Sequence, residues 1–497
     1  MAAGGEEPTQ RQAPRQPLGA GVLRQGAMWV TLTAALALPV SYLRNLLLGQ
    51  FDNTGDVAGT FAAILILFEF VRTFVLFGGT SVVTHFTPKI QERDAKARFL
   101  FVYTAISFAA AALLLVIALV WPQAFDLVTA GHATAQDRLV ISILALTFLA
   151  HQLCAFALAG LLDFRLSSVI LQFRLYTMIG VLGVGYFFFP DTVRDHTLLI
   201  FAVAIGVSNI LGVLIAIRRI FAEVGWPRGR YLPDRFWRFA TQVHANTICA
   251  FAFSNVDQIY VLTLLGRGEL GGYFLILQIS LLINFVPQHI AQVLLASFSS
   301  LIAGGEQDRL RAVYLRLCRL TILLATTLSL GMIFLSRFTV GIFGDWLVDD
   351  HRYLVLLAAA GNIGCIGSVN SMLILSKEKA GVYLVNNIIV VAVQLITMIL
   401  LIPDFGIYGA ISGRVAGTVV GQIGLFWIVR TRIPDMRLGI PFDYWVSQIL
   451  VLGSAIALLR FEFDDTLSSL AAGLAVGAIY LAAVRFKPSE LRSLLGR

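Results

Sequence analysis

Charged residues are scarce in this chain. Asp, Glu, Lys and Arg together make up 13% of its 497 residues, whereas a soluble globular protein contains roughly 25%. So few charges cannot cover the surface of a water-soluble protein of this length, and 58% of the residues are apolar. The composition therefore predicts an integral membrane protein.

Motifs of several enzyme classes are also absent from the sequence. It has no GxxxxGK[ST] loop, which argues against direct ATP hydrolysis, and no HExxH or GxSxG motif. The cysteines lie inside apolar segments, and their spacing matches no metal-binding motif. They are Cys154, Cys249, Cys318 and Cys365. We therefore expect no catalytic residues, no bound metal and no cofactor.

What the sequence does contain is long apolar segments. A membrane-spanning helix needs about 20 mostly apolar residues, and fourteen segments meet that requirement. They are residues 28–50, 57–79, 99–121, 139–161, 168–190, 197–217, 239–265, 270–302, 313–336, 353–376, 381–402, 407–429, 444–460 and 467–484. The predicted fold class is therefore an all-α integral membrane protein with about 14 transmembrane helices.

The distribution of basic residues orients these predicted spans. Cytoplasmic loops of membrane proteins retain Lys and Arg. With the N-terminus inside, 27 of the 37 Lys and Arg residues lie in or beside inner connections and six lie outside. We therefore expect both termini in the cytoplasm. The net charge of +8 is then largely a topological signal, and we expect no nucleic-acid partner.

Similar landmarks recur at a constant offset along the chain. Pro190 ends the fifth predicted span and Pro403 the eleventh, an offset of 213 residues. Arg219 and Arg432, just beyond the sixth and twelfth spans, are separated by the same 213 residues. This repeat predicts two six-helix lobes in the same orientation, an arrangement typical of secondary transporters.

The repeat also predicts the division of the chain. A polar, proline-containing start without a cleavable signal peptide precedes the lobes, and a helix pair follows them. The predicted parts are a disordered cytoplasmic tail (1–27), an N-lobe (28–219), a cytoplasmic basic linker (220–238), a C-lobe (239–432), and a helix pair with the cytoplasmic C-terminus (433–497).

Six ionisable residues lie within the predicted spans, where each costs a few kcal/mol on insertion scales. They are Arg44, Glu69, Arg72, Arg174, Asp257 and Arg414. Arginine donates paired hydrogen bonds to phosphate oxygens and stays charged at physiological pH. The excess of arginine therefore favours an anionic cargo such as a lipid diphosphate. Glu69 and Arg72 share a helix face, so they either pair structurally or belong to a cavity.

Several motifs resemble those of a known transporter family. The run Arg44-Asn-Leu-Leu-Leu-Gly49 resembles the "aRxLG" stretch of polysaccharide flippases, and Asn255-Val-Asp257 resembles their "nvD" segment. Pro403-Asp-Phe-Gly-Ile-Tyr-Gly-Ala410 resembles their "P.yGi.Gaa" turn. The similarities span about residues 28–432. The chain thus resembles the Wzx-type polysaccharide/O-antigen flippases of the multidrug/oligosaccharidyl-lipid/polysaccharide (MOP) exporter superfamily.

This resemblance implies two MATE-like lobes around a central cavity, plus a C-terminal helix pair, in the bacterial cytoplasmic (inner) membrane. The implied cargo is an oligosaccharide on a polyprenyl diphosphate, moved to the outer leaflet by alternating access for surface-polysaccharide biosynthesis. Membrane lipids and polysaccharide assembly proteins are the other expected partners. In this scheme Arg44, Arg72, Arg174 and Arg414 bind substrate, and Glu69 and Asp257 are candidates for ion coupling.

Three alternatives stay open at this point. A peptidoglycan-precursor flippase belongs to the same superfamily and also can have fourteen helices. A MATE-type multidrug antiporter usually has twelve, and buried carboxylates would suit its organic cations better than arginines. A membrane glycosyltransferase or polymerase would need catalytic groups in a large extramembrane segment, which the sequence does not provide.

Overall fold

The computed structural model describes residues 20–51, 53–121, 133–285, 294, 298, 301–302, 304–433, 441–461 and 466–484. These residues form helices and short connections, without a β-strand. The first half contains α1 (Ala20–Gln50), α2 (Asp56–Phe74), α3 (Gly79–Phe86), η1 (Thr87–Lys89), α4 (Arg93–Val120), α6 (Ala135–Gly160), α7 (Phe164–Phe188), α8 (Pro190–Asp195) and α9 (Thr197–Val224).

The second half repeats this pattern of long helices and ends with an added pair. It contains α10 (Phe236–Leu264), α11 (Arg267–Ser280), α13 (Gln307–Phe334), α14 (Ser336–Phe343), η2 (Asp345–Asp350), α15 (His351–Ile363), α16 (Gly367–Ser376), α17 (Ala380–Phe405) and α18 (Ile407–Arg432). The final pair consists of α19 (Phe442–Arg460) and α20 (Thr466–Ala483).

The predicted all-α membrane fold is confirmed. Within the described residues, twelve helical segments are long and apolar enough to cross a bilayer. Of the other two predicted spans, α1 covers the first, and α11 covers the start of the eighth, 270–302, part of which lies outside the described residues. The second span is broken between α2 and α3, where Gly78 and Gly79 have φ of 77° and 53°, a conformation that glycine adopts without strain.

Helices extend beyond several predicted boundaries. α1 begins at Ala20, so residues 20–27 of the predicted tail are helical, and residues 1–19 lie outside the described part. No proline occurs between Pro17 and Pro39 to interrupt this extension. The predicted linker 220–238 is helical at both ends, because α9 continues to Val224 and α10 starts at Phe236, and residues 225–235 connect the two helices.

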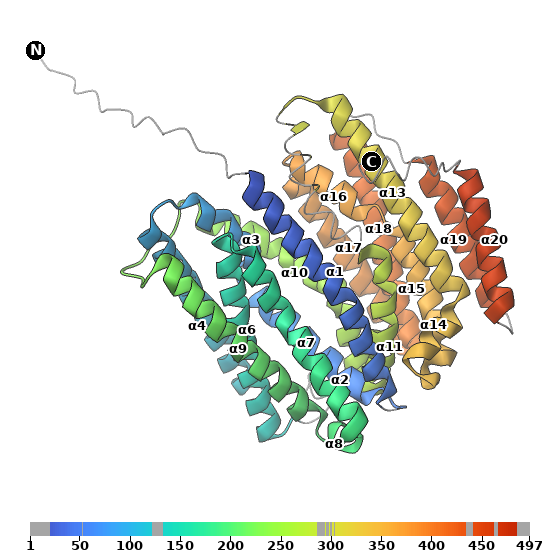
Figure 1. Cartoon of the computed structure of the whole chain (residues 1–497). Coiled ribbons are helices and arrows are strands. Elements are labelled where there is room, and N and C mark those ends of the chain that lie inside the picture. Colours follow the sequence, from blue (N-terminus) through green and yellow to red (C-terminus); the bar gives the residue numbers. More distant parts are fainter. Residues whose placement is uncertain are drawn as a thin grey trace, which may run out of the picture.

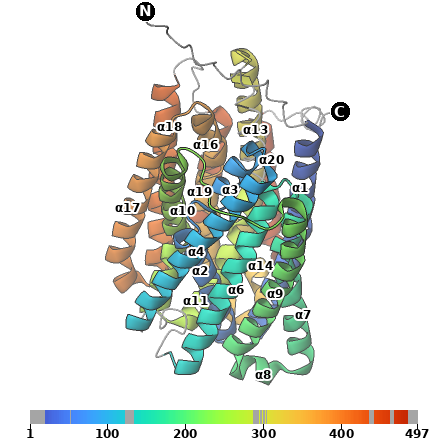
Figure 2. The ribbon, with the colours of Figure 1, turned by 90° about the vertical axis from the view of Figure 1, so that its left-hand side faces the viewer.

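The two halves form separate bundles that meet along a few helices. In Figure 1, α4, α6, α7 and α9 lie on one side and α13 to α20 on the other, with α1, α10 and α11 between them. Within the halves, α6 packs against α9 and α17 against α18. Figure 2, turned by 90°, shows the long helices running roughly in the same direction. Contact between the halves runs through α2, which packs on α10 and α11.

The halves are in close contact at one end of the bundle, called here the closed end and formed by residues 49–51, 53–59, 267–271 and 342–346. The Trp346 indole Nε1 donates a hydrogen bond of 3.0 Å to the Gly49 carbonyl. A Cβ atom on Gly55 would lie only 2.7 Å from the Gly268 carbonyl oxygen. The backbones therefore approach each other where glycine leaves room, as in other membrane helix interfaces.

Candidate functional site

A cavity of about 360 Å³ lies in the first half and contains two of the predicted arginines. Helices α1, α2, α7 and α9 form its wall together with the segment that begins with α11. This volume lies within the ~300–1,000 Å³ typical of ligand pockets. Its polar lining residues are Ser41, Tyr42, Arg44, Asn45, Gln172, Arg174 and Gln278, and no carboxylate is among the described lining residues.

Arg44 is held in place on the cavity wall by its own helix. Its Nη2 donates hydrogen bonds to Asn45 Oδ1 at 2.7 Å and to Ser41 Oγ at 3.2 Å. The guanidinium carbon lies 4.7 Å from the centre of the Phe61 ring, a cation–π geometry. These neighbours are neutral, so the charge of Arg44 has no opposite charge bonded to it within the described residues.

Arg174 of α7 lines the same cavity as Arg44. Its guanidinium carbon lies 4.8 Å from the Phe68 ring centre and 5.2 Å from that of Phe148. Its Nη1 is buried and has no hydrogen-bond partner in the described part of the chain. A buried donor without a partner costs roughly 1–3 kcal/mol, and more when it is charged. The Arg174 side chain is therefore arranged to receive an acceptor that the protein does not supply.

Together, Arg44 and Arg174 form an anion-binding arrangement. Two guanidinium groups in one cavity repel each other, and a bound anion relieves that repulsion. Each can donate two parallel hydrogen bonds to phosphate oxygens. The aromatic rings of Phe61, Phe68 and Phe148 hold the planar groups in position. This cavity can therefore bind a group with two or more negative charges, such as a diphosphate.

The other predicted residues of α2 lie outside this cavity lining. Arg72 Nη2 and Glu69 Oε2 are 2.6 Å apart, one helical turn from each other, and both side chains are partly exposed. Glu69 and Arg72 therefore form an ion pair along one face of α2. Neither residue is among those that line the cavity with Arg44 and Arg174, but both lie close enough to Arg174 for their charges to interact with it.

Asp257 and Arg414 form a second ion pair, in the other half. Arg414 Nη1 donates a hydrogen bond to Asp257 Oδ2, and Tyr273 Oη donates to the same oxygen at 2.5 Å. The side chain of Asp257 is fully buried, and that of Arg414 is only 12% exposed. The structure thus brings Arg44 together with Arg174, and gives the remaining two predicted arginines carboxylate partners.

Sequence reasoning missed the neutral polar residues of the cavity, including Asn45, Gln172 and Gln278. One signal was present, because Asn45 directly follows Arg44 in a segment that is otherwise apolar. For Gln172 and Gln278 no such signal exists, since single amides inside spans are common as helix contacts.

The fold is similar to those of solved transporters. Lipid II flippase MurJ, in an inward closed conformation, matches with a TM-score of 0.70 at 14% identity, over 92% of this chain and 98% of MurJ. An inward-facing multidrug resistance MATE family transporter of the MOP superfamily matches with a TM-score of 0.62 at 12% identity, over 83% and 99%. An outward-facing MATE structure matches with 0.58 at 14% identity, over 85% and 99%.

These similarities show a common fold. The sequence identities are too low to assign a function to this chain. No protein-family model matches the chain, and no curated protein matches it in sequence. The MATE-like arrangement implied by the sequence is nevertheless present over most of the chain.

Proposed function

We propose that this protein is a flippase that moves a polyprenyl-diphosphate-linked oligosaccharide from the cytoplasmic to the outer leaflet of the bacterial inner membrane. The observation that carries the proposal is one cavity that is lined by Arg44 and Arg174, with no carboxylate among its described lining residues. A diphosphate satisfies both charges and supplies the acceptor that Arg174 Nη1 lacks. The fold shared with flippases and exporters supports the same class of function.

In the proposed cycle, the diphosphate binds at the two arginines while the prenyl chain stays in the lipid. The closed end then opens as the two lobes rock against each other, and the head group leaves on the outer side. With both termini in the cytoplasm, the closed end faces outward, so the structure corresponds to a cytoplasm-accessible state. Surface-polysaccharide assembly proteins would receive the product.

We propose that the two ion pairs, Glu69–Arg72 and Asp257–Arg414, couple transport to ion movement. Arg72 and Arg414 are each held by a carboxylate, Glu69 and Asp257, which lowers the positive charge that they offer to a substrate. Protonation or cation binding at either carboxylate would weaken the pair and release the arginine. Substrate movement and ion movement would then share the same residues.

A peptidoglycan-precursor flippase is the second candidate, favoured by the TM-score of 0.70 with lipid II flippase MurJ. The precursor is also a polyprenyl diphosphate, so the arginine cavity suits both cargoes. A multidrug antiporter for organic cations is less compatible, because a cavity with two unpaired arginines repels cations.

The proposal is tested in liposomes that contain purified protein and fluorescent polyprenyl-diphosphate oligosaccharides, one with a surface-polysaccharide repeat and one with the peptidoglycan precursor. A membrane-impermeant quencher reports how fast each lipid changes leaflet. We expect protein-dependent exchange of at least one lipid, and about a tenfold or greater loss in Arg174→Ala, since a hydrogen-bonded charge pair contributes ~1.5–3 kcal/mol.

The control is Arg432→Ala, which removes an exposed arginine far along α18 without touching the cavity. It should exchange lipid at the native rate. Absence of exchange for every diphosphate lipid, with folded protein and with imposed ion gradients, would contradict the proposal and bring the antiporter forward.

A further inference from the structure

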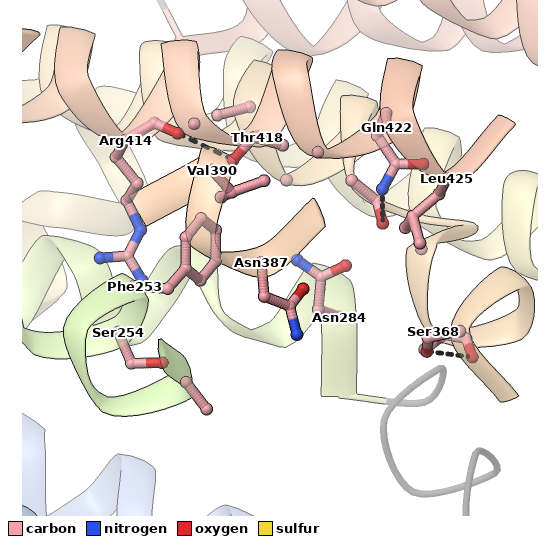
Figure 3. A pocket seen from close by; sticks show the side chains of 18 of the residues that line it. Phe253, Ser254, Asn284, Ser368, Asn387, Val390, Arg414, Thr418, Gln422 and Leu425 are labelled. Atoms are coloured by element: carbon pink, nitrogen blue, oxygen red, sulfur yellow. Dashed lines mark hydrogen bonds between the residues drawn. The ribbon is translucent and has the colours of Figure 1, made fainter. Parts of the chain in front are cut away.

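A second, larger cavity lies in the other half of the molecule and is lined by neutral polar groups. It has a volume of about 420 Å³ and is enclosed by α10, α15, α16, α17 and α18 with the segment that starts with α11. Figure 3 shows its side chains, from Arg414, Phe253 and Ser254 at one side to Gln422 and Ser368 at the other. The amide and hydroxyl groups on its wall belong to Ser254, Ser280, Asn284, Ser368, Ser371, Tyr383, Asn386, Asn387, Thr418 and Gln422.

Two of these polar groups are buried without a hydrogen-bond partner in the described part of the chain. One is Ser368 Oγ, and the other belongs to Gln422. Gln422 is 7% exposed; its Nε2 donates to the Gly364 carbonyl at 3.3 Å, whereas its Oε1 is buried without a partner. Since buried polar groups are normally paired, this wall requires water or a polar ligand.

The cavity is electrically neutral. Its single charged lining residue among those described is Arg414, and Asp257 neutralises that charge. A second phosphate finds no free cation here, and an organic cation finds no free carboxylate. Neutral groups that both donate and accept hydrogen bonds, such as sugar hydroxyls, match a wall of amides and hydroxyls.

Glycines on the wall allow neighbouring side chains and helices to pack closely against it. Gly361, Gly364 and Gly367 line the side formed by α15 and α16, and Gly417 and Gly421 line α18. A Cβ atom on Gly367 would lie 2.5 Å from Gln422 Nε2. Any side chain at position 367 would therefore displace the Gln422 amide.

The neutral cavity and the arginine cavity meet at one residue. Leu281 lines both, and its neighbours separate, with Ser280 and Asn284 on the neutral wall and Gln278 on the arginine wall. The two cavities thus lie on either side of the same helical segment. Leu281 is 36% exposed, so the two cavities are adjacent at this side chain.

We infer that the neutral cavity is the subsite for the uncharged sugars next to the diphosphate. This inference rests on the proposed flippase function and adds the part of the substrate that the cavity selects. Hydrogen bonds from Asn284, Asn387 and Gln422 recognise sugar hydroxyl groups, while the arginines recognise the diphosphate. The second half of the protein therefore recognises the sugars, and the first half binds the charged diphosphate.

The test compares two fluorescent lipids in the same liposomes, a polyprenyl diphosphate that carries neutral sugars and the same polyprenyl diphosphate without sugar. Asn387→Leu, which replaces an amide by an apolar side chain of similar size, should slow exchange of the glycosylated lipid about tenfold, as expected for one or two lost hydrogen bonds. Exchange of the sugar-free lipid should be unchanged. Arg174→Ala should slow both lipids.

A second variant, Gly367→Ala, displaces the Gln422 amide on the same wall. It should also slow exchange of the glycosylated lipid and leave exchange of the sugar-free lipid unchanged. Melting temperature and elution volume establish that each variant is folded. Equal effects of Asn387→Leu and Gly367→Ala on both lipids, or no effect on either, would overturn the sugar subsite while leaving the flippase intact. No exchange of either lipid by the native protein would overturn the proposed function and the subsite with it.

Discussion

At the scale of single residues, we expect the stability of the protein to be sensitive to mutation of the buried ion pair of the second half. Asp257 accepts hydrogen bonds from Arg414 and Tyr273, and its Oδ1 is buried without a partner. Removing one member of such a pair leaves an uncompensated buried charge, which costs ~3–5 kcal/mol. Replacing both members by apolar residues costs far less, because no charge remains buried.

We therefore expect Asp257→Asn to lower the thermal unfolding temperature of the purified protein by several degrees. The double variant Asp257→Leu with Arg414→Leu should recover most of that loss. Intrinsic fluorescence during heating in detergent measures both. A double variant as unstable as Asp257→Asn would show that the hydrogen bond from Tyr273 matters more than the charge balance.

The sequence predicted the arginines of the site and not their partners, for a physical reason. A charge inside an apolar span is visible because it is costly there, so Arg44, Arg174 and Arg414 could be identified from hydropathy. Which of them meet depends on how helices far apart in the chain pack: Arg44 and Arg174 are on α1 and α7, and Arg414 on α18. Neutral amides such as Asn387 cost little and leave no comparable signal.

At the scale of helices, glycines set how closely the two halves approach at the closed end. Gly271 of α11 packs against the backbone of Gly55 and Gly59, with no room for a Cβ atom. Spans are predictable from apolar length, but this contact is not, because glycine serves equally as a hinge, a helix end or a close packing site. The break between α2 and α3 at Gly78 is a helix end of that kind.

Gly271→Val should therefore separate the halves at the closed end. Spin labels on cysteines at Asn53 and Asp345, both exposed, report the distance between the halves by double electron–electron resonance. We expect a longer or broader distance distribution in Gly271→Val than in the parent. Gly180→Val is the matched control, because nothing lies within 4 Å of a Cβ atom at position 180. Equal distances in the two variants would mean that α11 accommodates the side chain without opening.

At the scale of the whole molecule, the first and last described helices, α1 and α20, begin and end on the same side of the bundle. α1 ends at the closed end, where Gly49 contacts Phe343 and Trp346. α13 ends there too, because it leads directly into α14, which ends at Phe343. α20 finishes at the other end, because the Val484 carbonyl accepts a hydrogen bond of 2.9 Å from Arg319, in the first half of α13. α1 therefore starts, and α20 finishes, at the end opposite the closed end.

This geometry makes the predicted orientation testable at two positions. The connection from α9 to α10 shares its end with the start of α1, and most Lys and Arg residues were assigned to that side, so Asp234 should face the cytoplasm. Thr192 lies on α8, which is separated from that connection by one span, α9. Arg194 of the same helix donates a hydrogen bond of 2.6 Å to the Phe51 carbonyl near the closed end, so Thr192 should face outward. In a variant without native cysteines, Thr192→Cys should react with a membrane-impermeant maleimide in intact spheroplasts. Asp234→Cys should react only after the membrane is opened. The reverse pattern would mean that the closed end faces the cytoplasm, and the arginine cavity would then receive its diphosphate from the outer side.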